Sequence, residues 1–101
     1  MKVTLRTVGG FTGPAGAQTH VVDVDELPPA DAERFLGHVT RAVPEGLPRR
    51  LMKAAPQPWD FVRHLKIEDG ETVRELQFHD EAASPSLREL VQEIEELSAR
   101  T

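Results

Sequence analysis

The chain has 101 residues, a formal net charge of −5 at pH 7 and no cysteine. This length suits one domain with a single core, so we expect residues 1–101 to form one domain. Nucleic acids and anionic membranes bind basic surfaces, and the acidic balance therefore argues against both as main partners. The absence of cysteine excludes a disulfide framework and a thiolate site.

The opening residues MKVTLRTV lack the continuous apolar run of a signal peptide. We therefore expect a cytoplasmic protein that has no membrane partner. We also expect the protein to be a monomer when free. The same residues alternate, with Val3 and Leu5 on one face, which predicts a strand over 2–8. A glycine-rich segment, VGGFTGPAG, follows, and then a second apolar run over 19–27. The two runs predict a β-hairpin.

Two segments carry apolar residues at helical spacing. The first helix, within residues 28–43, has a stripe of Ala32, Phe35, Leu36, Val39 and Val43, and Pro44 ends it. The second begins after Ser84 as N-cap, with Pro85 at the first helical position. Its stripe consists of Leu87, Leu90, Val91, Ile94 and Leu97.

Between the helices, an irregular stretch over 44–58 precedes two further strands over 60–67 and 72–79, joined by the turn EDGE. Phe61, Leu65 and Ile67 face one way in the first of them, where Leu76 and Phe78 can meet them. The order ββαββα predicts an α+β fold, a four-stranded antiparallel sheet with both helices on one face. Alternating chain direction then places the glycine-rich segment, the long loop delivered by the first helix and residues 80–84 at one end of the sheet. Met1, the EDGE turn and the C-terminus lie at the other.

Catalytic and metal-binding patterns are missing from the sequence. The glycines lack the GK[ST] ending of a phosphate-binding loop and precede a strand, unlike a dinucleotide fingerprint. The four histidines contain no i, i+4 helical pair, and no serine has a nucleophile context. We therefore expect no metal, no cofactor and no enzymatic activity.

The candidate partner-binding residues lie in two loops: Gly9, Gly10, Phe11, Thr12, Gly13, Arg49 and Arg50. Phe11 stands at the centre of a glycine-rich turn, where it either folds back over the end of the sheet or is displayed as an apolar anchor for a pocket on another protein. Arg49 and Arg50 belong to a basic cluster that either balances surface charge or contacts a partner.

Taken together, several segments resemble the emfourin family: a first strand running into GGFTG, the segment DELPPADAERF, EGLPRR, a strand ending in IEDGE and a helix beginning PSLREL. The resemblance spans nearly the whole chain, and the strand followed by GGF is its most specific part. Arg63 departs from the family pattern, which leads us to expect an aromatic residue there.

Emfourins are small cytoplasmic inhibitors of protealysin and related thermolysin-like zinc metallopeptidases, so the resemblance implies this function. It also implies that the edge formed by Gly9 to Gly13 and part of the long loop fills the active-site cleft, where it excludes the attacking water or offers a carbonyl to the zinc. The alternative is a non-enzymatic module that uses the same edge to bind a partner other than a protease.

Overall fold

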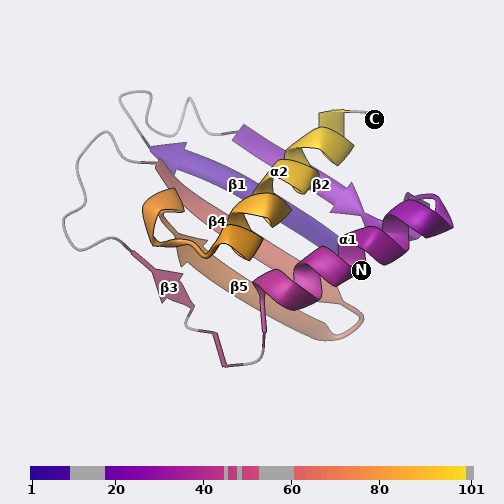
Figure 1. Ribbon diagram of the computed structural model, residues 1–101, viewed down its shortest axis with the longest axis horizontal. Helices are drawn as coiled ribbons and strands as arrows, with labels where there is room; N and C mark the ends of the chain where they lie inside the picture. Colours follow the sequence, from indigo (N-terminus) through magenta and orange to yellow (C-terminus); the bar gives the residue numbers. More distant parts are fainter. Residues whose placement is uncertain (10–17, 45, 48, 53–60, 100–101) are drawn as a thin grey trace.

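The structure is a computed structural model that describes residues 1–9, 18–44, 46–47, 49–52 and 61–99 (Figure 1). Its elements are β1 (Lys2–Gly9), β2 (Gln18–Asp23), the 3₁₀ helix η2 (Val24–Glu26), α1 (Pro29–Ala42), β3 (Arg50–Leu51), β4 (Phe61–Asp69), β5 (Thr72–Phe78), the 3₁₀ helix η3 (Asp80–Ala82) and α2 (Pro85–Ala99).

The strands form one five-stranded sheet in the order β2-β1-β4-β5-β3. The expected antiparallel pairing holds for the first four strands in this order. The prediction of a four-stranded sheet is wrong, because the two-residue β3 adds a fifth, parallel edge strand beside β5. The amides of Gln77 and His79 donate to the carbonyls of Arg49 and Leu51 at 2.7 and 2.9 Å. The intervening segment thus satisfies backbone donors at the edge of β5.

Both helices lie on the same face of the sheet, as predicted (Figure 1). The Oγ atom of Ser84 accepts a hydrogen bond from the amide of Leu87 at 3.2 Å, which confirms the predicted N-cap. The five apolar residues predicted for α2 are all buried. They share a core with inward-facing residues of the sheet, namely Val3, Leu5, Val22, Leu65, Ile67, Leu76 and Phe78.

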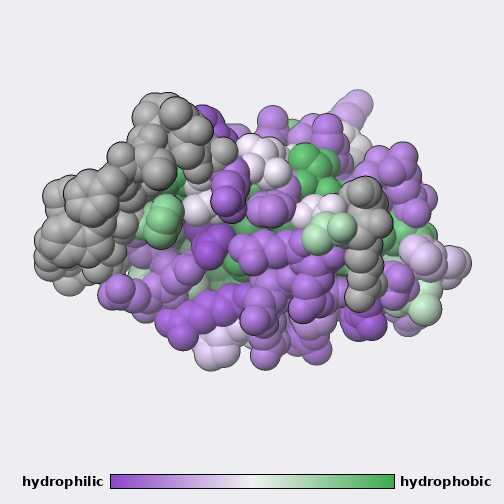
Figure 2. Space-filling view, turned by 90° about the horizontal axis from the view of Figure 1, so that it is seen from above, coloured by the Kyte–Doolittle hydropathy of each residue, from purple (hydrophilic) through white to green (hydrophobic). Residues whose placement is uncertain are grey.

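The second strand is shorter than the predicted 19–27. It ends at Asp23, where the carboxylate accepts a hydrogen bond from the amide of Asp25 at 3.1 Å and η2 begins. This local side-chain bond offers the backbone an alternative to the sheet ladder. In α1, Leu36 is 39% exposed and does not join the core, whereas Phe35 is fully buried. Viewed from above, the surface is mainly hydrophilic with small hydrophobic patches (Figure 2).

The sequence predicts that the first helix delivers the following loop to the glycine-rich end of the sheet. This prediction is wrong. The Arg74 guanidinium, near the start of β5, donates to the carbonyls of Val43 and Pro44 at 2.9 and 3.1 Å. The end of α1 therefore lies near the β4–β5 turn, because α1 crosses the sheet obliquely beside α2 (Figure 1). The segment after Pro44 then covers the remaining distance along β5.

The neighbouring residues Phe35 and Leu36 allow a matched test of this core. We expect Phe35→Ala to lower the free energy of unfolding by about 3 to 5 kcal/mol, because it empties a fully buried site. Leu36→Ala, on the exposed side of the same helix, should cost less than about 1 kcal/mol. Urea denaturation measures both values, and equal losses would contradict this packing.

Candidate functional site

Several chain segments meet at one end of the sheet. The register places Gly9 opposite Phe61, and it places Leu51 beside Phe78 at the end of β5. The 3₁₀ helix η3 follows directly and contacts β4. We call the surface formed by Gly9, Phe61, Leu51 and η3 the Gly9 end. It is the end at which the sequence places the glycine-rich segment.

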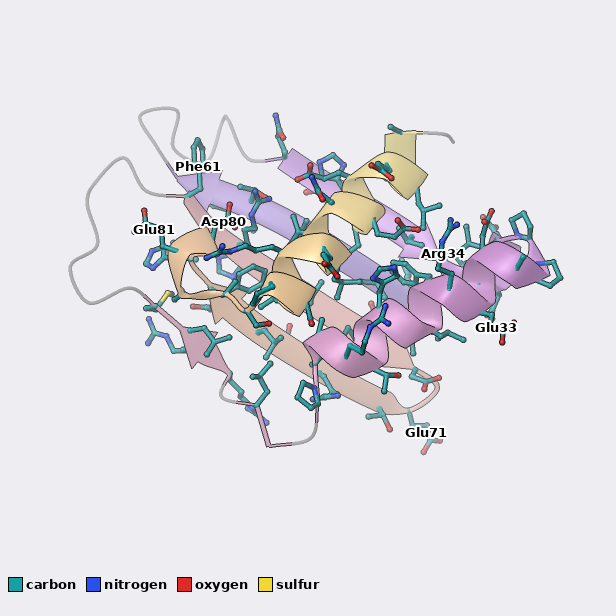
Figure 3. The ribbon with its side chains drawn as sticks, in the orientation of Figure 1. Glu33, Arg34, Phe61, Glu71, Asp80 and Glu81 are labelled. Atoms are coloured by element: carbon teal, nitrogen blue, oxygen red, sulfur yellow. The ribbon has the colours of Figure 1, made fainter. Side chains whose placement is uncertain are left out.

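Phe61 is the most exposed large hydrophobic residue of the described chain, at 56%. It projects from the first position of β4, close to η3 (Figure 3). The sequence predicted its face of the strand correctly but grouped it with the buried Leu65 and Ile67. Phe61 is exposed because it is the first residue of β4. In the sequence, the only indication of this exposure is the expectation that two long loops meet at this end of the sheet.

The Arg63 guanidinium joins four elements beside Phe61. Its Nε and Nη2 atoms donate to the two carboxylate oxygens of Asp80 in η3, at 2.6 and 3.1 Å. Its Nη1 atom donates to Thr7 in β1 at 3.1 Å and to Glu95 in α2 at 3.3 Å. The Arg63 side chain is only 17% exposed, so the bidentate contact is partly shielded from water.

Electrostatics favour the charged form of Arg63. Burial by itself lowers the pKa of the guanidinium, but the hydrogen bond and charge of Asp80, followed by those of Glu95, outweigh it and raise the pKa above its usual value. Arg63 therefore stays charged over the whole stable range of pH. An aromatic residue, expected here from the family resemblance, could not make these bonds.

A second arginine holds η3 from the other side. The Nε atom of Arg88 in α2 donates to the carbonyl of Asp80 at 2.9 Å, and its Nη2 atom donates to the carbonyl of Glu81 at 3.4 Å. Arg63 thus fixes the carboxylate of Asp80, while Arg88 fixes the backbone of the same turn. Between the two arginines lies an open hollow of about 300 Å³, lined also by Glu89, Gln92 and Glu95.

The predicted partner-binding residues fall in different places. Gly9 ends β1 at the Gly9 end. Arg49 and Arg50 lie at β3 on the same end, but β4 and β5 separate them from β1. The predictions for Gly10, Phe11, Thr12 and Gly13 lie outside the described residues.

Met1 lies at the opposite end of β1 from Gly9, where its carbonyl accepts a hydrogen bond from the amide of Val24 at 2.9 Å. Among the described residues, no group of three or more His, Cys, Asp or Glu side chains could hold a metal ion. No described helix is long and apolar enough to cross a membrane.

Comparison with known families shows to which family the chain belongs. A family model described as Emfourin matches residues 5–95. The chain belongs to the emfourin family. At the level of the family, membership implies a role as a metallopeptidase inhibitor rather than as an enzyme. Neither a comparison with curated proteins nor one with solved structures found a match.

The contacts of Arg63 predict that it orders the Gly9 end of this emfourin. We expect Arg63→Met to lower the free energy of unfolding by about 1 to 2 kcal/mol, because the carboxylates it leaves are half exposed and remain solvated. The substitution should also speed up hydrogen exchange at the amides of Ala82 and Ala83, which close η3, more than at the amides of α1. Hydrogen exchange followed by NMR measures this difference.

Lys66→Met provides the control, because Lys66 lies on the opposite face of the same strand and its side chain is 46% exposed. It should leave the exchange of η3 unchanged. Unchanged protection of η3 in Arg63→Met would show that the turn does not depend on this arginine.

Proposed function

We propose that the protein inhibits a thermolysin-like zinc metallopeptidase of the protealysin type by seating the Gly9 end at the active-site cleft. In this proposal, Gly9 to Gly13 and Phe61 contact the cleft, and Arg49 and Arg50 lie at the margin of the interface. The proposed place of action is the cytoplasm. The family match supports the class of target.

The observation that carries the binding mode is the exposure of Phe61 beside Gly9. A half-exposed phenylalanine on a paired strand presents a large apolar surface whose ordering cost has largely been met by folding. Aromatic side chains of this kind fill pockets at the centres of protein interfaces. Thermolysin-like clefts have a specificity pocket that accepts bulky apolar side chains, and this pocket suits either Phe61 or Phe11.

The two arginine clamps on η3 support the same surface. Binding is weakened when a contact surface must be ordered during association. Hydrogen bonds from Arg63 and Arg88 hold η3 next to β4 in the free protein, so the rim beside Phe61 is already in place. The carboxylate of Asp80 is also neutralised by Arg63, which lowers the cost of placing this rim against another protein.

A titration of purified thermolysin-like peptidases tests the proposed function. Each peptidase is assayed with a fluorogenic peptide substrate at increasing concentrations of the protein, and a serine peptidase serves as the control enzyme. We expect stoichiometric loss of activity for at least one thermolysin-like enzyme and none for the serine peptidase. Full activity of every metallopeptidase at an excess of the protein would overturn the proposal and favour a partner that is not a protease.

Phe61→Ala should raise the inhibition constant at least thirtyfold, since truncation of an interface hot spot costs about 2 kcal/mol or more. Its effect on the free energy of unfolding should stay near 0.5 kcal/mol, because the side chain lies outside the core. Phe11→Ala is measured in the same way. The phenylalanine whose truncation raises the inhibition constant more is the one that fills the specificity pocket.

Val73→Ala is the matched control, since Val73 is 52% exposed on β5 and faces away from the helices. It should inhibit like the unaltered protein. Equal inhibition constants for Phe61→Ala and Val73→Ala, with both variants folded by thermal melting, would remove Phe61 from the interface.

A further inference from the structure

The second face of the sheet carries an ordered pattern of charge. Both helices cover the opposite face, and no described element packs over this one (Figure 1). Because neighbouring strands are in register, its side chains form rows across the sheet. One row crosses all five strands and contains Thr19, Arg6, His64, Gln77 and Arg50.

The next two rows pair opposite charges. Lys66 lies directly opposite Glu75, and the Nζ atom of Lys66 is 3.9 Å from the carboxylate of Glu68. Lys2 lies between Asp23 and Glu68. Each lysine of this face therefore has a carboxylate on an adjacent strand, the arrangement that stabilises a sheet.

The arginine row lacks this compensation. Arg6 lies opposite Thr19 and His64, and Arg50 lies beside Gln77. Both arginines are exposed, and within the described chain neither forms an ion pair. Three basic side chains in a row without an acid do not strengthen the sheet, so the stability of the fold does not account for the arrangement.

The row is also close to the Gly9 end. Arg6 precedes Gly9 by three strand residues, a distance of about 10 Å. Val8 and Val62, a half-buried apolar pair in register, lie between the row and that end on the same face. A typical protein interface covers about 800 Å² on each partner, which corresponds to a radius of about 16 Å. A protein seated on the Gly9 end therefore reaches this row.

We propose that Arg6, His64 and Arg50 form a second contact surface, which binds an acidic patch beside the active-site cleft of the same metallopeptidase. This inference rests on the proposed function. Arginine guanidinium groups bind carboxylates in bidentate geometry. The row spans three strand spacings, about 14 Å, so it matches several carboxylates on a partner surface rather than one. Since the chain as a whole carries a net charge of −5, this local positive surface also orients an approaching acidic partner.

The test compares two double variants with the same change in net charge. Arg6→Gln with Arg50→Gln removes the uncompensated charges, whereas Lys2→Gln with Lys66→Gln removes charges of the same face that have carboxylate partners. Association rate and inhibition constants are measured with the inhibited peptidase at about 0.02 and about 0.3 M NaCl, conditions that differ strongly in screening. Thermal melting of each variant is recorded on the same preparations.

We expect the arginine variant to associate about tenfold more slowly at low salt and to lose most of its salt dependence, while the lysine variant changes about threefold or less. Arg6→Lys with Arg50→Lys keeps both positive charges and should therefore retain the salt dependence. This result would show that the effect of the glutamine substitutions comes from lost charge and not from misfolding. If the unaltered protein inhibits but the arginine and lysine variants behave alike, the second contact surface is wrong and the proposed function stands. If the unaltered protein inhibits no metallopeptidase, both are overturned.

Discussion

The pairing of β1 with β4 is the constraint on which the remaining features depend. These strands come from distant parts of the chain, and their register runs from Lys2 opposite Glu68 to Gly9 opposite Phe61. A slip of one residue between the two strands would turn either Val3 and Leu5 or Leu65 and Ile67 away from the helices. The same register brings Thr7 beside Arg63, so that one guanidinium can bond to β1, η3 and α2. The core, the hydrogen bonds of Arg63 and the arrangement of the Gly9 end are therefore set together.

In this arrangement, the two faces of the sheet carry different kinds of side chain. The inner face supplies the apolar surface that both helices cover, and near the Gly9 end of this face Arg63 donates a hydrogen bond to Thr7. The charge of Arg63 is used to position η3. The outer face has no described cover, and there Arg6 and Arg50 keep their charges without an ion pair among the described residues. An inhibitor that contacts its enzyme through an apolar end and a charged face gains affinity from the first and orientation from the second.

Local sequence signals predicted most of the elements, because periodicity and capping act over a few residues. The stripe of α2 and its Ser84 cap are clear examples, and all five predicted core residues of this helix are buried. Short-range signals failed where a contact between distant segments decides the outcome. β3 exists because Arg49 and Leu51 meet the open edge of β5. Leu36 has the right spacing for the core, but the position of α1 on the sheet leaves it exposed.

The sequence by itself determined the family, the α+β class, the two helices and the end of the sheet at which β1 runs into the glycine-rich segment. It did so because composition, apolar period and strand order are properties of the chain. Only the tertiary structure decided which residues of that end are available. Phe61 and Leu65 share a face and a strand, yet one is 56% exposed and the other 1%. The reason is physical: exposure depends on which helices and strands pack above a side chain, and neither alternation nor spacing encodes that coverage.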